Sequence, residues 1–228
     1  RKDKKIIEKQ DFLDAVDRII GGLEKKNKII TPKEKRTIAY HEAGHASVSW
    51  LLEHANPLVK VTIVPRGQAL GAAWYLPEER QITTKAQLLD QMISLLGGRA
   101  AEEIVFGEVS TGALNDLERV TKQAYAMVVY YGLDKEIGNI SFYDSSGQSE
   151  YGFQKPFSDK TAEKIDAQIR SMVEEAYNKA KAILTENREK LDALATILVE
   201  REVIFREDVE NIYGKRPWDE EKTKDQQA

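Results

Sequence analysis

Apolar residues recur at intervals of three and four along most of the chain, the spacing that places them on one face of an α-helix. Turn and capping residues separate these periodic stretches from one another. The pattern predicts helices at residues 9–23, 32–54, 84–106, 113–131, 158–186, 187–200 and 206–213. We therefore expect a mainly α-helical fold in which the last three helices form a C-terminal bundle.

Two short segments show the alternation of a β-strand instead of the helical spacing. Residues 58–65 alternate and are rich in valine and isoleucine, and residues 70–76 form a second candidate that ends before Pro77. We expect the two to pair as a hairpin or to join residues 139–143 in a small sheet. The predicted class is thus α+β, with helices in large excess.

Composition narrows the classes of function. The chain has 228 residues, of which 41% are hydrophobic and 32% are charged, as in a soluble globular protein. The net charge of −4 argues against a nucleic-acid partner, which would favour a basic face. No cysteine is present, so disulfides, thiolate metal sites and cysteine nucleophiles are excluded. No apolar run is long enough to span a membrane, and no signal peptide is recognisable.

The helix predicted from residue 32 carries the main chemical signal, the run His41-Glu42-Ala43-Gly44-His45. Residues four apart lie one helical turn apart on the same side, so both imidazoles can reach a single ion. This H-E-x-x-H pattern is typical of a zinc site whose glutamate is the general base. The alternative is a buried helix in which both histidines only make hydrogen bonds.

Such a zinc site needs a third protein ligand and one open position. Leu51 occupies the position at which a third histidine would extend the motif, and His54 falls out of phase, as a surface or helix-end histidine does. The ligand must then be a carboxylate, and Glu102, Glu103 and Asp116 are candidates. Asp116 lies in a first helical turn, where an acidic residue can also serve only the helix dipole. The residues alone leave this choice open.

Several stretches resemble the peptidase part of the FtsH family, the membrane-anchored AAA zinc proteases. They occur in the family's order and include Tyr40–His45 and Ser110–Leu117, together with residues 31–36, 57–67, 75–78 and 96–104. The resemblance covers about residues 9–214. It implies a helical zinc-peptidase core in which His41, His45 and Asp116 hold Zn²⁺. It also implies Glu42 as the base and leaves Glu102 and Glu103 to support or packing.

The resemblance also implies a division of the chain. Residues 1–28 are similar to the end of an upstream ATPase module and its linker, residues 29–214 to the peptidase domain, and residues 215–228 are expected to be a disordered tail. The chain starts at Arg1 within a charged helical pattern, so we expect a piece of a longer protein. ATP and Mg²⁺ would act only through the missing ATPase module, and a membrane only through a missing upstream segment.

One strand departs from the family pattern. Residues 71–76 read Gly-Ala-Ala-Trp-Tyr-Leu, where the family more often has an aromatic residue directly after the glycine. Because the family's strand lies beside the active site, Trp74 is a candidate for shaping a side-chain pocket. The alternative is that Trp74 only packs within the sheet.

The expected function is an ATP-dependent zinc metalloendopeptidase subunit that cleaves unfolded or membrane-extracted polypeptides. The resemblance implies a homo-hexamer at the cytoplasmic face of the bacterial inner membrane, with the matrix side of the mitochondrial inner membrane as the alternative. A non-catalytic module for hexamer assembly is the rival interpretation, since the helices from residue 158 to 213 carry more apolar surface than an active site needs. A zinc hydrolase of small molecules is a third.

Overall fold

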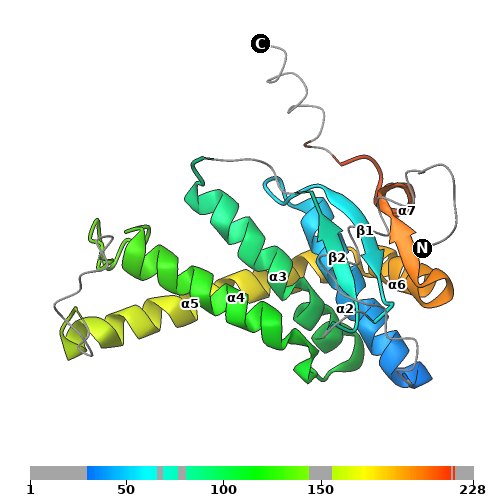
Figure 1. Cartoon of the computed structure of the whole chain (residues 1–228), viewed down its shortest axis with the longest axis horizontal. Helices are drawn as coiled ribbons and strands as arrows, with labels where there is room; N and C mark the ends of the chain where they lie inside the picture. The colour runs from blue at the N-terminus through cyan, green and yellow to red at the C-terminus, as the bar shows by residue number, and fades with distance from the viewer. Residues whose placement is uncertain (1–29, 66–68, 77–80, 144–155, 217, 219–228) are drawn as a thin grey trace, which may run out of the picture.

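The computed structural model describes residues 30–65, 69–76, 81–143, 156–216 and 218. Within them lie six α-helices and one three-stranded sheet (Figure 1), so the predicted mainly helical α+β class is confirmed. The helices are α2 (Pro32–Leu51), α3 (Lys85–Phe106), α4 (Leu114–Tyr125), α5 (Asp159–Glu186), α6 (Arg188–Arg201) and α7 (Arg206–Tyr213). The strands are β1 (Leu58–Thr62), β2 (Ala72–Tyr75) and β3 (Val203–Phe205). The helix expected at residues 9–23 lies outside the described residues.

The sheet differs from its prediction in the identity of its third strand. β1 is central and pairs antiparallel with β2 on one edge and with β3 on the other. Residues 139–143 form no strand: most of this segment is exposed, and the Phe142 amide donates to the carbonyl oxygen of Val129 instead of to the sheet. β3 escaped prediction because three residues are too few to show an alternation.

Two helices differ from their predicted bounds. α2 ends at Leu51, earlier than the expected His54, because Leu52 already has an extended backbone. The helix expected at residues 113–131 has three parts: a 3₁₀ turn η1 (Thr111–Ala113), α4, and a π-helix η2 (Ala126–Tyr130). Apolar spacing does not distinguish these helix types, since their side-chain periods are similar over one or two turns.

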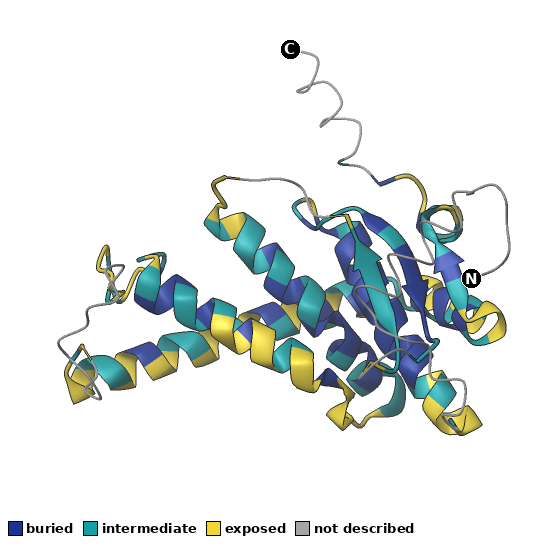
Figure 2. Ribbon diagram, in the orientation of Figure 1, coloured by how far each residue is buried: buried dark blue, intermediate teal, exposed yellow. Residues whose placement is uncertain are grey.

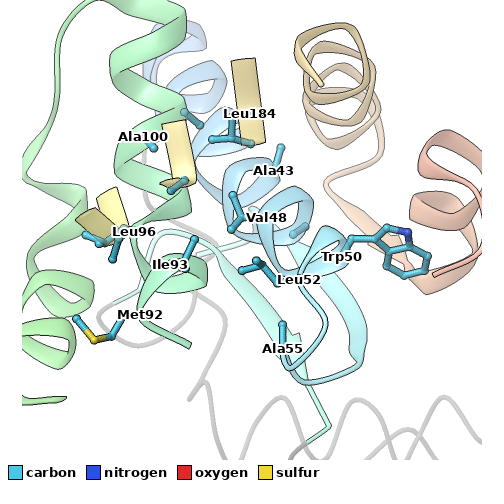
Figure 3. Close-up of a cluster of buried hydrophobic side chains, with 14 of the residues drawn as sticks. Ala43, Val48, Trp50, Leu52, Ala55, Met92, Ile93, Leu96, Ala100 and Leu184 are labelled. Atoms are coloured by element: carbon cyan, nitrogen blue, oxygen red, sulfur yellow. The ribbon is translucent and has the colours of Figure 1, made fainter. Parts of the chain in front are cut away.

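Helix α2 is the centre of the fold. A capping box begins the helix: the Thr31 hydroxyl accepts from the amide of Glu34. Every residue from Ile38 to Trp50 is buried, because the sheet, α3 and α6 surround the helix. Figure 3 shows Ala43 and Val48 of α2 in the same apolar cluster as Ile93 and Leu96 of α3. By contrast, the outer faces of α4 and α5 are largely exposed (Figure 2).

Glycines let α2 and α3 cross at very short range. A Cβ atom added to Gly44 would lie 2.3 Å from the carbonyl oxygen of Gly97, and one on Gly97 would lie 2.7 Å from that of Gly44. No side chain fits at either position, so the two backbones are in direct contact. This crossing sets the position of α3 relative to the histidines of α2.

The segment after α7 is not wholly free of the fold. Arg216 lies within the expected disordered tail, yet it is buried and donates to the carbonyl oxygens of Leu52 and Ala55 at 2.8 and 2.5 Å. These carbonyls follow the end of α2, where the backbone lacks helical partners. Among the described helices, none is both long and apolar enough to cross a bilayer.

Candidate metal centre

His41 and His45 point their Nε2 atoms at one another from successive turns of α2. The two Nε2 atoms lie 3.1 Å apart, and both residues are buried. Their Nδ1 atoms point away, to Glu102 Oε1 at 2.7 Å and to the carbonyl oxygen of Ser94 at 2.9 Å. A carbonyl oxygen only accepts, so His45 carries its proton on Nδ1 and leaves the Nε2 lone pair available for a metal.

Asp116 brings a third ligand atom to the same point. It stands in the first turn of α4, directly after the turn η1, which the Ser110 hydroxyl caps by accepting from the amide of Gly112. The Asp116 Oδ2 atom lies 3.4 Å from His41 Nε2 and 3.4 Å from His45 Nε2. These side chains form the one group of potential metal ligands found among the described residues.

The triangle of ligand atoms fits a zinc ion. Its sides are 3.1, 3.4 and 3.4 Å. Tetrahedral zinc, bound at about 2.0–2.1 Å by nitrogen and oxygen, spaces its ligand atoms about 3.3–3.4 Å apart. Two imidazoles and a carboxylate are also the donors of catalytic zinc sites with one open position. The donor set and its spacing therefore suit the ion, and the assignment of the three residues as its ligands stays a prediction.

Glu102 contacts the site on the side of His41 that faces away from the ligand triangle. Its Oε1 accepts from His41 Nδ1, and its Oε2 accepts from the amide of Ser110 at 2.6 Å. The Ser110 hydroxyl also donates to Oε1, at 3.0 Å. Glu102 thus connects α2 to the turn that precedes Asp116 and orients both. Carboxylates that orient metal-binding histidines in this way raise ligand basicity and metal affinity.

Glu42 is buried between α2 and the strand β2. Strand residue Ala73 donates its amide hydrogen to the Glu42 carboxylate. A Cβ atom on Gly71 would lie 2.7 Å from Glu42 Oε1, so only glycine allows the backbone to come this close. The carboxylate flanks the triangle of ligand atoms but is not part of it, as a general base requires.

Three carboxylates make the centre favourable for positive charge. Burial opposes a charge on His41, yet its hydrogen bonds to Asp116 and Glu102 outweigh this and raise its pKa to about 10. Burial also opposes the charge of Asp116, but the two neighbouring imidazoles hold its pKa well below the usual range. Burial raises the pKa of Glu42, although the histidines work against that shift. A cation is therefore well accommodated here.

Helix α3 comes close to the imidazoles through another glycine. A Cβ atom on Gly98 would lie 2.5 Å from His41 Nε2 and 2.6 Å from His45 Nε2. Any side chain at this position would occupy the space next to the predicted ion. The motif of residues 96–104 thus supplies a small residue, and the carboxylate of Glu102 one turn further on, to the same centre.

The side chains that carry the ligand atoms line a cleft of about 1490 Å³. Both histidines, Glu42 and Asp116 line it, together with β2 and the start of α4. Trp74 is absent from the lining and instead packs on Lys60, whose Nζ lies 5.5 Å from the ring centre. This contact fits the alternative that Trp74 packs within the sheet.

The remaining sequence candidates lie away from the ligand triangle. Glu103 accepts from the hydroxyl of Tyr177 and lies 3.4 Å from Lys181 Nζ, so it joins α3 to α5. His54 follows the end of α2, where its amide donates to Asp90. Sequence reasoning missed the role of Ser94, because a backbone carbonyl leaves no trace in residue type. It also missed the contacts of Ser110 with Glu102, because they join residues of different elements.

Comparisons with known proteins show the family of the chain. The family model of "Peptidase family M41" matches residues 28–212. The chain is 63% identical over 218 residues to the ATP-dependent zinc metalloprotease FtsH of Parabacteroides distasonis. This match covers 96% of the chain and 32% of that relative. It is 54% identical to the FtsH of Rhodothermus marinus, covering 96% and 32%. It is 47% identical to the mouse mitochondrial inner membrane m-AAA protease component AFG3L2, covering 95% and 27%. The chain thus spans about a third of the length of these relatives.

Proposed function

Because the chain belongs to peptidase family M41, we propose that it is the zinc peptidase part of a longer ATP-dependent protease and hydrolyses peptide bonds of polypeptide substrates. One observation carries the proposal: His41 Nε2, His45 Nε2 and Asp116 Oδ2 converge with the spacing that zinc requires, next to a buried glutamate. When bound, the ion polarises the scissile carbonyl and acidifies the attacking water.

Glu42 provides the proton transfers. It takes a proton from the attacking water and afterwards gives it to the amine that leaves. Its hydrogen bond with the Ala73 amide fixes the carboxylate beside the ligand triangle. Burial raises its pKa, and a raised pKa suits a carboxylate that must both accept and return a proton.

Strand β2 supports an extended polypeptide as the substrate. It is an edge strand of the described sheet and borders the cleft, although its Ala73 amide is already engaged by Glu42. An extended chain can add to such an edge by main-chain hydrogen bonds, which are independent of sequence. This arrangement favours a protease of unfolded chains over a zinc hydrolase of small molecules.

The rest of the proposal concerns the longer protein. We propose that it forms a homo-hexamer and draws on ATP and Mg²⁺ through an ATPase module outside this chain. Its proposed place is the cytoplasmic face of the bacterial inner membrane, with the mitochondrial matrix side as the alternative. A non-catalytic assembly module is less well supported, because every residue that the chemistry needs is present and lies at the centre.

Removal of the metal tests the proposal. We expect the chain with one equivalent of zinc to cleave unfolded casein, to lose this activity after dialysis against 1,10-phenanthroline, and to regain it with zinc but not with magnesium. The physical reason is that zinc both polarises the carbonyl and acidifies the attacking water. Gel analysis of casein, with zinc measured by elemental analysis, checks the result; cleavage that survives full zinc removal would refute the proposal.

A further inference from the structure

Beyond His45, towards the end of α2, the cleft has a polar region that the proposed chemistry does not use. We call it the polar arm and define it by Ser49, Tyr75, Gln91, Ser94, Arg119 and Gln123, all of which line the cleft. Ser49 lies one turn after His45, and its hydroxyl lies 3.1 Å from that of Tyr75. Gln123 joins α4 to α3 by donating to the carbonyl oxygen of Leu88 at 2.6 Å. The polar arm is therefore a fixed part of the site.

Arg119 is the cation of this arm. It follows Asp116 by three residues on α4, so both side chains leave the helix on nearly the same side. Arg119 is exposed and has no hydrogen bond or ion pair with the described residues. The other cation that lines the cleft, Lys33, lies 3.8 Å from Glu108. Among the described lining residues, Arg119 thus offers the positive charge that no carboxylate compensates.

Tyr75 lies within the reach of this charge. Burial raises the pKa of the Tyr75 hydroxyl, and the Arg119 guanidinium opposes the shift. The hydroxyl forms a single hydrogen bond with the described residues, to Ser49, and keeps a second position for another group. A guanidinium and a hydroxyl that share one arm of the cleft match the two oxygens of a carboxylate.

We propose that Arg119 is a specificity-determining residue that binds an acidic side chain of the polypeptide substrate close to the scissile bond, with Tyr75 beside it. The inference rests on the proposed peptidase function. Elsewhere, the cleft is unfavourable for acidic segments of a substrate because carboxylates line it. These are Glu34, Glu42, Glu102, Glu108, Asp116 and Glu118. One subsite next to Arg119 is the place where a glutamate or aspartate is favoured.

Peptides with blocked termini test this inference. A series of acetylated and amidated peptides carries one glutamate at each position around the cleavage site, and each has a glutamine twin. For the zinc-loaded chain, we expect one position at which kcat/KM is about three- to tenfold higher for glutamate than for glutamine, the range for a partly exposed charged hydrogen bond. Arg119→Gln should bring this ratio to one, and Arg119→Glu should favour lysine there.

The control is Arg170→Gln, the same exchange at an exposed arginine of α5 that does not line the cleft. It should keep the ratio of the unsubstituted chain. A ratio near one at every position, or a ratio that Arg119→Gln leaves unchanged, would overturn the inference. If no peptide is cleaved, the proposed peptidase function is wrong. The inference about Arg119 is then tested by the affinity of the chain for the glutamate and glutamine peptides. Fluorescence anisotropy with the zinc-loaded Glu42→Gln chain should then show the same preference, and equal affinities would overturn it.

Discussion

Replacing Glu42 by glutamine is expected to lower the rate of casein or peptide hydrolysis by about 10²–10⁴-fold, the usual contribution of a general base. Glutamine keeps the shape of the side chain and an oxygen that can accept from the Ala73 amide, but it cannot take up a proton. The fold around β2 should therefore persist while the proton transfer is lost. Initial rates under substrate excess measure the effect.

Zinc content separates this outcome from a damaged site. Glu42 is not part of the ligand triangle, so the Glu42→Gln chain should bind one zinc ion per molecule, as the unsubstituted chain does. Elemental analysis after gel filtration gives this number. Hydrolysis at the unsubstituted rate with zinc in place would show that another group is the base.

The second large effect is expected for Asp116→Ala, which should weaken zinc binding by more than about 100-fold. Loss of a group that only orients a metal ligand already costs about 10–100-fold, so loss of a ligand should cost more. Without Asp116 the ion keeps two protein ligands, fewer than the three of a catalytic zinc site. Competition with a chromophoric chelator measures the affinity.

Two neighbouring variants are controls for Asp116→Ala. Asn115→Ala changes the preceding residue of the same turn, which lines the cleft but is not in the ligand triangle. Glu103→Gln changes a carboxylate that the sequence offered as a ligand and that contacts Tyr177 and Lys181 instead. Both should keep the affinity of the unsubstituted chain within a few-fold. Unchanged affinity of Asp116→Ala would mean that a different carboxylate is the third ligand.

Much of the fold could be predicted because most helices have local sequence signals, namely capping residues and the spacing of apolar residues. The capping boxes at Thr31 and Thr84 are present in the structure, and α5 and α6 agree with their predicted bounds to within a residue or two. The sheet was harder, since the pairing of β1 with β3 joins segments about 140 residues apart and leaves no local pattern. The same holds for Arg216, whose partners lie on the loop after α2.

In the candidate site, too, local features could be predicted and long-range contacts could not. Helical spacing alone brings His41 and His45 to one side of α2, and the Nε2 distance of 3.1 Å agrees with it. Spacing could not choose between Glu102 and Asp116, because both are long-range neighbours of α2. The resemblance made that choice, and the geometry gives a reason for it: Glu102 faces the Nδ1 atom of His41, whereas Asp116 faces the Nε2 atoms.

The close approaches of the glycines had no signal in a single sequence. Gly98 stands in contact with both imidazoles, and Gly44 with the backbone of Gly97, but a glycine within a helix otherwise indicates only a weakened helix. Only the crossing of α2 and α3 shows why no side chain is tolerated. The place of Arg119 in the cleft could not be predicted from the sequence either, since it depends on how α4 lies against α2.

The central claim is that one zinc ion is held by His41, His45 and Asp116. Anomalous diffraction at the zinc absorption edge, from crystals of the chain grown with zinc, tests it most directly. We predict a single strong peak at about 2.0–2.2 Å from the two Nε2 atoms and from Asp116 Oδ2. In that structure, Glu102 should still accept from His41 Nδ1. A peak bonded to Glu102 or Glu42 in place of Asp116, or no peak between the two imidazoles, would contradict the claim.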